Sequence, residues 1–145
     1  MTIAGKPQAG DRIGYGPIYP LRFVGGDFEA GSGFALVRSA ALIILGADAA
    51  TQDGKVHGEF PANPRLGTSI RRYIHRNVRG LFSTIIRVAG VEGLTRFEPR
   101  LEINPSRSDV TTDNRRRVKI QLRARVNPEY SGTGVSDSGG IEATY

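Results

Sequence analysis

The segment Arg115–Val126 alternates apolar and basic or polar residues, and this alternation most constrains the fold. Successive side chains of a β-strand point to opposite faces, so one face of this strand is apolar and the other basic. The apolar positions are Val118, Ile120, Leu122, Ala124 and Val126. The opposite positions are Arg117, Lys119, Gln121, Arg123 and Arg125. We expect a strand with one face in the core, lying at a sheet edge where positive charge prevents indiscriminate pairing.

Three stretches before this strand have the spacing of helices. Ser32 can cap a helix over Phe34–Leu45, which is apolar nearly all round and therefore expected to be buried. A second helix over Ser69–Arg79 has an apolar stripe opposite a basic face. The apolar stripe contains Ile70, Tyr73, Ile74, Val78 and Leu81, and the basic face contains Arg71, Arg72, His75, Arg76 and Arg79.

A third helix is expected over Leu81–Phe97. Gly90 and Gly93 weaken it by about 1 kcal/mol each relative to alanine. An alternative role for these glycines is to allow the close approach of another backbone.

A proline directly after this third helix marks its end, in the tripeptide Glu98-Pro99-Arg100. Proline lacks a backbone donor and pushes the preceding residue toward extended geometry, so we expect a helix-to-strand corner here. The strand covers Arg100–Asn104, and Pro105–Asn114 is expected to be a polar hairpin connection. The acid and the guanidinium form either a surface ion pair worth about 0–1 kcal/mol or, because apolar residues flank them, a buried pair.

The remaining segments are rich in glycine, proline and serine. Met1–Gly33 has no helical period and is expected to be an extended arm with at most one short strand. Gly46–Gly67 is a long connection, which inside a compact domain is usually functional or disordered. Residues 127–145 are interpreted as a flexible tail. The prediction is thus one α+β domain over residues 34–126, with two or three helices packed on a small antiparallel sheet, an extended N-terminal arm and a C-terminal tail.

Positive charge is concentrated in the middle of the chain. Residues 65–126 carry 15 basic and 5 acidic groups, a net of +10, whereas the whole 145-residue chain carries +6. A basic block of this kind is typical of nucleic-acid-binding modules, so the arginine-rich helix face and strand provide one functional hypothesis. Few aromatic residues accompany the basic positions, which argues against stacking on single-stranded bases.

Catalytic and metal-binding patterns are missing from the sequence. The chain has no cysteine, and His57 and His75 stand in different contexts without metal-ligand spacing. Glu59 and Glu98 are a conceivable glycosidase pair, but nothing in the sequence places them at the required separation. We therefore predict a protein that is not an enzyme and that needs no cofactor or metal. No stretch is long and apolar enough for a membrane span, so no membrane partner is expected.

The region Gly58–Arg125 resembles the small baseplate wedge proteins of contractile phage tails, the sheath-initiator family often labelled "lysozyme-like". That family shows Gly-Glu-Arg, three residues, Pro, one residue and Phe-Gly, then two helices, then Glu-Pro-Arg leading into a β-hairpin. Gly58, Glu59, Pro64 and Gly67 stand at this spacing, and Glu98, Pro99 and Arg100 match fully. Phe60 replaces the family arginine and Leu66 replaces the aromatic residue. Arg65 is the candidate substitute for the missing arginine.

The resemblance implies a structural subunit rather than an enzyme. Its expected partners are other baseplate wedge proteins, sheath subunits and tail tube proteins, with copies arranged around a sixfold tail axis, made in the bacterial cytoplasm and located in the baseplate of a virion or related injection particle. Nucleic acid is the less favoured partner. The expected contact residues are Gly58, Glu59, Arg65, Glu98, Pro99, Arg100, Arg117, Lys119, Arg123 and Arg125. The basic strand would accept an added strand from the first sheath ring.

Overall fold

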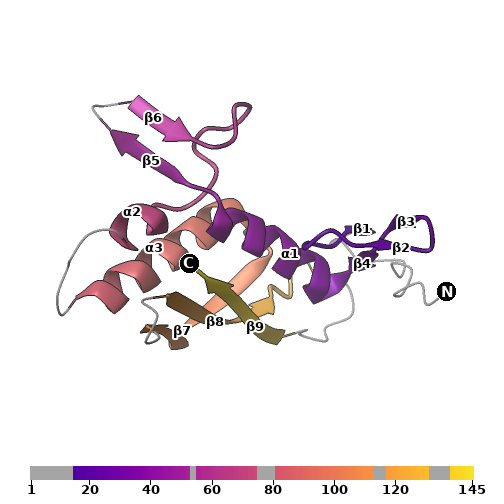
Figure 1. Cartoon of the computed structure of the whole chain (residues 1–145). Coiled ribbons are helices and arrows are strands. Elements are labelled where there is room, and N and C mark those ends of the chain that lie inside the picture. The colour runs from indigo at the N-terminus through magenta and orange to yellow at the C-terminus, as the bar shows by residue number, and fades with distance from the viewer. Residues whose placement is uncertain (1–14, 53–54, 75–80, 113–116, 131–137) are drawn as a thin grey trace.

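The computed structural model of the chain describes residues 15–52, 55–74, 81–112, 117–130 and 138–145, and the side chains of residues 50–57 are outside the description. The described part contains three helices and several small antiparallel sheets (Figure 1). The fold is therefore α+β, as the sequence predicted. No helix in this part of the chain is long and apolar enough to cross a membrane.

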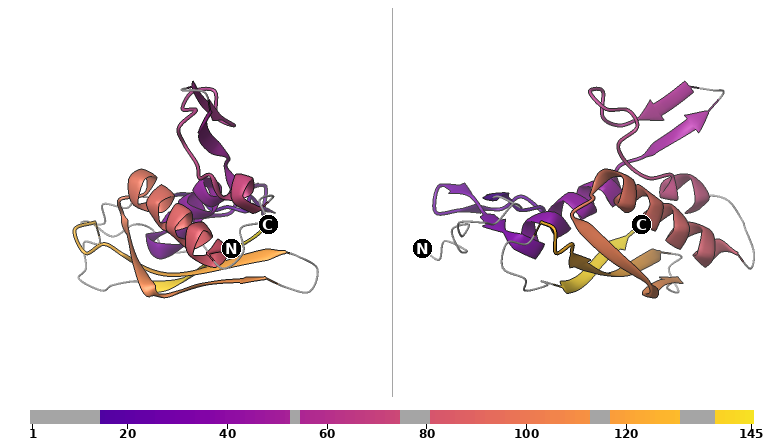
Figure 2. Two further views of the ribbon diagram at one scale, coloured as in Figure 1. Left: turned by 90° about the vertical axis from the view of Figure 1, so that its left-hand side faces the viewer. Right: turned by 180° about the vertical axis from the view of Figure 1, so that it is seen from behind.

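A three-stranded antiparallel sheet carries the core. Its strand order is β7 (Leu101–Thr112), β8 (Val118–Val126) and β9 (Ser138–Thr144). The helices α1 (Gly33–Gly46) and α3 (Phe82–Phe97) lie on one face, and no described helix covers the opposite face (Figure 2). All five apolar side chains of β8 are buried against these helices, as the alternation predicted: Val118, Ile120, Leu122, Ala124 and Val126.

The expected first and third helices are confirmed to within about one residue at each end. Val37, Ala41 and Ile44 of α1 are buried, but Ile43 is 40% exposed, so this helix is not buried all round. Ser32 occupies the N-cap position without a side-chain capping hydrogen bond. The second helix, α2, covers Ile70–Ile74 in the described chain. Its expected continuation, with His75, Arg76 and Arg79, lies outside the described residues.

The position of the basic strand in the sheet was predicted wrongly. β8 pairs with β7 on one side and with β9 on the other, so it is the central strand and its backbone is not available to a partner. The expected connection over Pro105–Asn114 is also wrong as far as Thr112, because β7 continues to that residue through a register shift between Asn104 and Asp109. β7 is therefore longer than the sequence indicated, whereas β8 begins at Val118 and leaves Arg117 outside the strand.

The interpretation of residues 127–145 as a flexible tail is wrong for the described residues at its end. Ser138–Thr144 forms β9, whose Ile141 is fully buried opposite Leu122 of β8. Gly139 lies against α1, since an added Cβ there would be 2.6 Å from the ring of Phe34. Residues 131–137 lie outside the described chain. The C-terminal segment is thus part of the core domain rather than an appendage to it.

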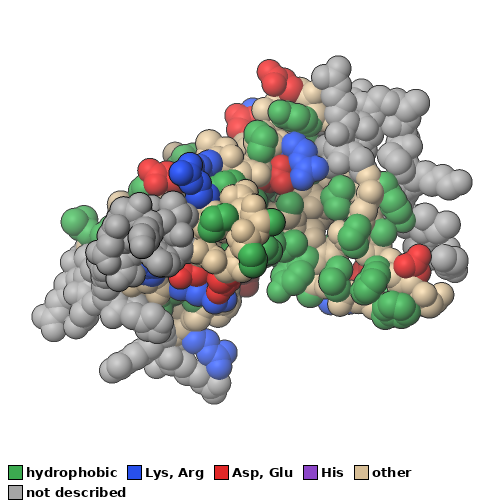
Figure 3. Space-filling model, turned by 90° about the horizontal axis from the view of Figure 1, so that it is seen from above, with side chains coloured by type: hydrophobic (Ala, Val, Ile, Leu, Met, Phe, Trp, Pro, Cys, Tyr) green, Lys and Arg blue, Asp and Glu red, His purple; other side chains and the backbone are tan. Residues whose placement is uncertain are grey.

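The described part of the N-terminal arm is more regular than predicted. β1 (Tyr15–Pro17) pairs with β4 (Ala30–Ser32), and between them β2 (Phe23–Val24) pairs with β3 (Asp27–Phe28). The backbone N–H of Tyr19 donates to the hydroxyl of buried Ser39, which ties the arm to α1. Hydrophobic side chains gather over this end of the molecule (Figure 3).

The connection between α1 and α2 contains a second hairpin. β5 (Ala49–Gln52) pairs with β6 (Lys55–Gly58), and the hairpin extends away from the helices and the three-stranded sheet (Figure 1). A long connection was expected over Gly46–Gly67, but its strands were not. The chain returns through residues 59–69 to the start of α2.

Candidate functional site

The Glu98-Pro99-Arg100 corner joins the end of α3 to the start of β7. Glu98 is only 3% exposed, and its two carboxylate oxygens accept parallel hydrogen bonds from one guanidinium group. Arg100 Nε donates to Oε1 at 2.6 Å and Nη2 donates to Oε2 at 2.7 Å. This is the bidentate, charge-assisted arrangement for which arginine is suited. Of the two alternatives from the sequence, the buried ion pair is therefore the correct one.

Backbone hydrogen bonds fix the shape of the corner. The N–H of Glu98 donates to the Leu94 carbonyl of the last helical turn, and the N–H of Leu101 donates to the Glu98 carbonyl across the exposed Pro99. The N–H of Asn127, just after β8, donates to the Arg100 carbonyl at 2.8 Å. The hydrogen bond to Glu98 raises the pKa of Arg100 above its ordinary value, although burial acts in the opposite direction. Arg100 is thus held charged, in one orientation, with its side chain 27% exposed.

The glycines of the Gly58–Gly67 segment stand where two backbones meet. A Cβ on Gly58 would lie 2.0 Å from the carbonyl oxygen of Pro64, so this turn closes on itself with no room for a side chain. Gly67 has φ of +132°, and its Cβ would lie 2.6 Å from the carbonyl oxygen of Ala47. Both positions require glycine for steric reasons.

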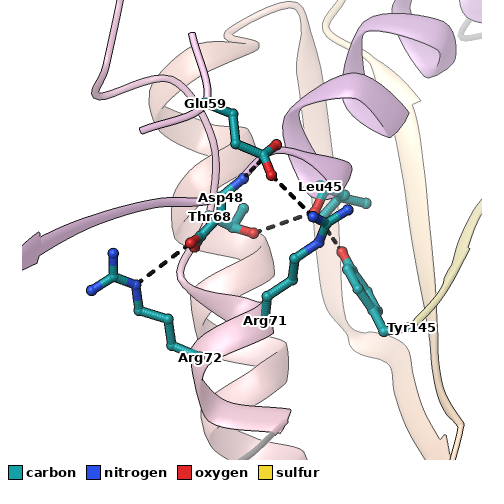
Figure 4. A network of polar contacts seen from close by, with 7 residues as sticks. All are labelled: Leu45, Asp48, Glu59, Thr68, Arg71, Arg72 and Tyr145. Carbon is teal, nitrogen blue, oxygen red and sulfur yellow. Dashed lines mark hydrogen bonds and ion pairs between the residues drawn. The ribbon is translucent and has the colours of Figure 1, made fainter. Parts of the chain in front are cut away.

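The residues at the base of the β5–β6 hairpin form a network of ion pairs and hydrogen bonds (Figure 4). Glu59 accepts from Nη1 of Arg71 at 3.0 Å and from the N–H of Asp48 at 3.3 Å. Arg72 pairs with Asp48 at 3.6 Å. Arg71, and not Arg65, therefore occupies the place of an ion-pair partner for Glu59. The exposed Arg65 lies in the turn after Pro64, and no carboxylate of the described residues lies within ion-pair distance of it.

The C-terminal end of α1 is capped by two hydroxyl groups at this network. The carbonyl of Leu45 accepts a hydrogen bond from the phenol of Tyr145 at 2.6 Å and one from Thr68 at 3.4 Å (Figure 4). The last four carbonyls of a helix have no partner within the helix, so these donors satisfy one of them. Tyr145 also exchanges two backbone hydrogen bonds with Val118. The network thus connects α1, α2 and the three-stranded sheet.

Gly93 of α3 lies against the end of the Gly58–Gly67 segment. A Cβ at Gly93 would lie 2.5 Å from the side chain of Thr68 and 3.4 Å from the carbonyl oxygen of Gly67. The small residue therefore permits close approach of another segment, which was one of the two roles considered for it. Because Gly93 precedes Glu98 by little more than one helical turn, the Gly58–Gly67 segment and the Glu98 corner both rest on the same end of α3.

The three basic residues of β8, Lys119, Arg123 and Arg125, are separate from this region and lie on the uncovered face of the sheet. Lys119 pairs with Glu142 of β9 at 2.8 Å, and Arg125 pairs with Glu102 of β7 at 2.7 Å. The hydrogen bonds from these partners lower the pKa values of Glu102 and Glu142. Arg123 is exposed on this strand, and Arg117 is exposed just before it. The basic row is therefore partly neutralised by neighbouring strands, which the sequence could not show.

Sequence reasoning missed several residues of the network at the hairpin base. Asp48 and Tyr145 were not predicted to have a role, and Arg71 was assigned only to a basic helix face. An aspartate just after a helix, such as Asp48, only weakly indicates a functional contact. The local sequence around Tyr145 gives no indication of its hydrogen bond to α1. Among the described residues no group of three histidine, aspartate or glutamate side chains is placed to hold a metal ion. No protein-family model matches the chain, and no match was found among curated proteins.

The buried phenol gives the first testable prediction. Burial raises the pKa of Tyr145 from its ordinary value of 10.0 to about 12. Because the folded pKa is above the unfolded one, this contribution to stability is complete below pH 10 and is lost as pH rises through about 12. At neutral pH, Tyr145→Phe should lower the free energy of unfolding by about 1 kcal/mol through the lost hydrogen bond.

Urea unfolding of the native protein and of Tyr145→Phe, compared from neutral to strongly alkaline pH, measures this effect. The stability difference between the two should shrink and then reverse above pH 10. Gly46→Ala, which changes no titratable group and adds a Cβ that meets nothing within 4 Å, is the control and should keep a constant difference from the native protein. Parallel pH profiles for the native protein and Tyr145→Phe would show that the phenol contributes no pH-dependent stability.

Proposed function

We propose that this protein is a non-enzymatic structural subunit in the baseplate of a contractile injection machine. The observation that carries the proposal is the buried bidentate pair of Glu98 and Arg100 at a helix-to-strand corner. It stands where the resemblance to the wedge family requires it, and the glycines of the first motif rest on the same end of α3. A rigid corner of this kind suits a part that must present fixed surfaces to several neighbours.

The proposed assembly role uses a free edge of the sheet rather than β8. Within the described sheet β7 and β9 are the outer strands, so each has one side without a strand partner. β7 is interrupted by its register shift, whereas β9 pairs regularly with β8 over seven residues. A sheath arm that adds a strand would therefore find the more regular template at β9, with ladder hydrogen bonds as the source of affinity.

Nucleic-acid binding is less well supported than the sequence suggested. Arg71 and Arg72 of the basic helix face pair with Glu59 and Asp48. Lys119 and Arg125 of the basic strand pair with acids as well. Each pair reduces the positive charge available to a phosphate backbone, which supplies most of the affinity in such complexes.

The test is removal of the gene from a bacterium or phage that makes the corresponding particle. Electron microscopy should show tails or baseplates without extended sheath, and the native gene should restore sheath formation. The Arg96→Ala variant, which removes an exposed charge of α3 outside the expected contact residues, should also restore it. Particles with normal sheath in the deletion strain would refute the proposal. A complex that nuclease treatment dissolves would favour the nucleic-acid alternative.

A further inference from the structure

The uncovered face of the three-stranded sheet has two neighbouring hollows that share two arginines. The first hollow, of about 800 Å³, is lined by residues that include Asn104, Arg107, Arg123 and Ser138. The second, of about 590 Å³, is lined by residues that include Arg107, Arg123, Gly140 and Glu142. Arg107 and Arg123 belong to both hollows, and we call the combined depression the arginine cleft. The volume of each hollow falls within the range of ligand-binding clefts.

The register shift in β7 builds one wall of this cleft. The Ser108 hydroxyl, which is buried, donates to the Asn104 carbonyl at 2.7 Å and accepts from the N–H of Arg123 at 3.3 Å. The Asn104 side chain accepts from the N–H of Ser106 at 3.1 Å. These bonds fix the bulged segment between the two paired halves of β7. A bulge that re-aims a side chain is a common device next to binding sites, and here it presents Arg107 beside the face of β8.

The two arginines that belong to both hollows differ from the paired basic residues of this face. Within the described chain, neither Arg107 nor Arg123 has a carboxylate partner within ion-pair distance, whereas Lys119 and Arg125 are paired. The Arg123 side chain extends beside Gly140 of β9, and its Nη1 lies 3.9 Å from the position of an added Cβ. Two uncompensated guanidinium groups therefore face one hollow, where planar donors suit carboxylates or phosphates.

We propose that the arginine cleft binds an acidic peptide segment of a partner protein, with Arg107 and Arg123 holding its carboxylates. Charge complementarity favours an anionic ligand. The acidic residues that also line the hollows favour a peptide over a nucleic acid. Glu102, Asp109 and Glu142 line the same hollows and would repel a continuous phosphate backbone. They tolerate a peptide whose carboxylates are separated by neutral residues. The inference rests on the proposed function, because the segment would belong to a neighbouring subunit of the assembly.

The test selects peptides directly on the purified full-length protein. A library of random short peptides displayed on yeast is sorted for binding, and the enriched peptides are measured by fluorescence anisotropy. Enriched sequences should contain spaced aspartate or glutamate. Their affinity should fall about tenfold or more in Arg107→Gln/Arg123→Gln, because each charge-assisted contact is worth more than a neutral one. Arg107→Lys/Arg123→Lys should fall to an intermediate level, since the charge remains but the planar fork is lost.

The matched control is Arg22→Gln/Arg96→Gln, which removes two arginine charges from exposed positions outside the cleft and outside the expected contact residues, and should change affinity less than about twofold. The target arginines are exposed, so all variants should keep the native circular dichroism and melting temperature. Failure to enrich acidic peptides, or equal losses in both glutamine pairs, would overturn the proposal. Binding of a single-stranded oligonucleotide in place of peptides would overturn it in favour of nucleic acid. The peptide-binding assay does not involve sheath assembly. Its result and the result of the gene deletion can therefore fail independently.

Discussion

Arg100→Ala should lower the free energy of unfolding by about 3–5 kcal/mol, because it leaves the carboxylate of Glu98 buried without its partner. Glu98 is 3% exposed and both of its oxygens accept hydrogen bonds from that one guanidinium. Few water molecules can reach the carboxylate to replace them. The backbone carbonyl of residue 100 can still accept the N–H of Asn127 in this variant. The corner should nevertheless become less rigid, because the arginine side chain no longer holds Glu98 in place.

Urea unfolding followed by circular dichroism measures this loss, and two further variants define its origin. Arg100→Lys keeps the charge but cannot form two parallel bonds, so an intermediate loss is expected. Glu98→Gln/Arg100→Leu removes both charges and should be more stable than Arg100→Ala alone, because no buried ion is left unpaired. Arg125→Ala breaks an ion pair that is half exposed and should leave the urea midpoint nearly unchanged. If Arg100→Ala were as stable as Arg125→Ala, the corner would not depend on the ion pair.

Gly67→Ala should lower the free energy of unfolding by about 2–4 kcal/mol, from backbone strain and overpacking together. The φ of +132° is one that L-amino-acid side chains rarely adopt, and the new Cβ would lie 2.6 Å from the Ala47 carbonyl oxygen. That carbonyl accepts the N–H of Thr68 at 3.0 Å, so it cannot move without losing a hydrogen bond. The substitution thus acts on the contact that holds the end of the long connection against α1.

Gly46→Ala is the matched control for this prediction. Gly46 is the last residue of α1 and an added Cβ there would meet nothing within 4 Å, so alanine should stabilise the protein by about 0.5 kcal/mol. Both variants change glycine to alanine, and they differ only in the space and the backbone angle at the site. Thermal unfolding by calorimetry compares them. Equal effects at the two positions would show that the close approach of Gly67 to Ala47 is not required.

The sequence by itself determined the elements that have a strong local pattern. The alternation of residues 118–126 predicted both the strand and the buried face of β8, because period-two patterning needs no knowledge of the partner strands. Pro99 predicted the end of α3, since a residue without an N–H that restricts its predecessor acts locally. The candidate pair of Glu98 and Arg100 was found for the same reason, as its members are two residues apart.

The tertiary structure alone decided which strands lie at the edge and which charges are paired. β9 has two glycines and a single fully buried apolar residue, Ile141, so its sequence has little local signal and its pairing depends on β8 and α1. Arg71 pairs with Glu59, and the phenol of Tyr145 donates a hydrogen bond to the Leu45 carbonyl, although the members of each pair are far apart in the sequence. The arginine cleft depends on a bulge that aligns Arg107 with Arg123 of another strand. Such contacts arise only when distant segments are brought together by the burial of the common core.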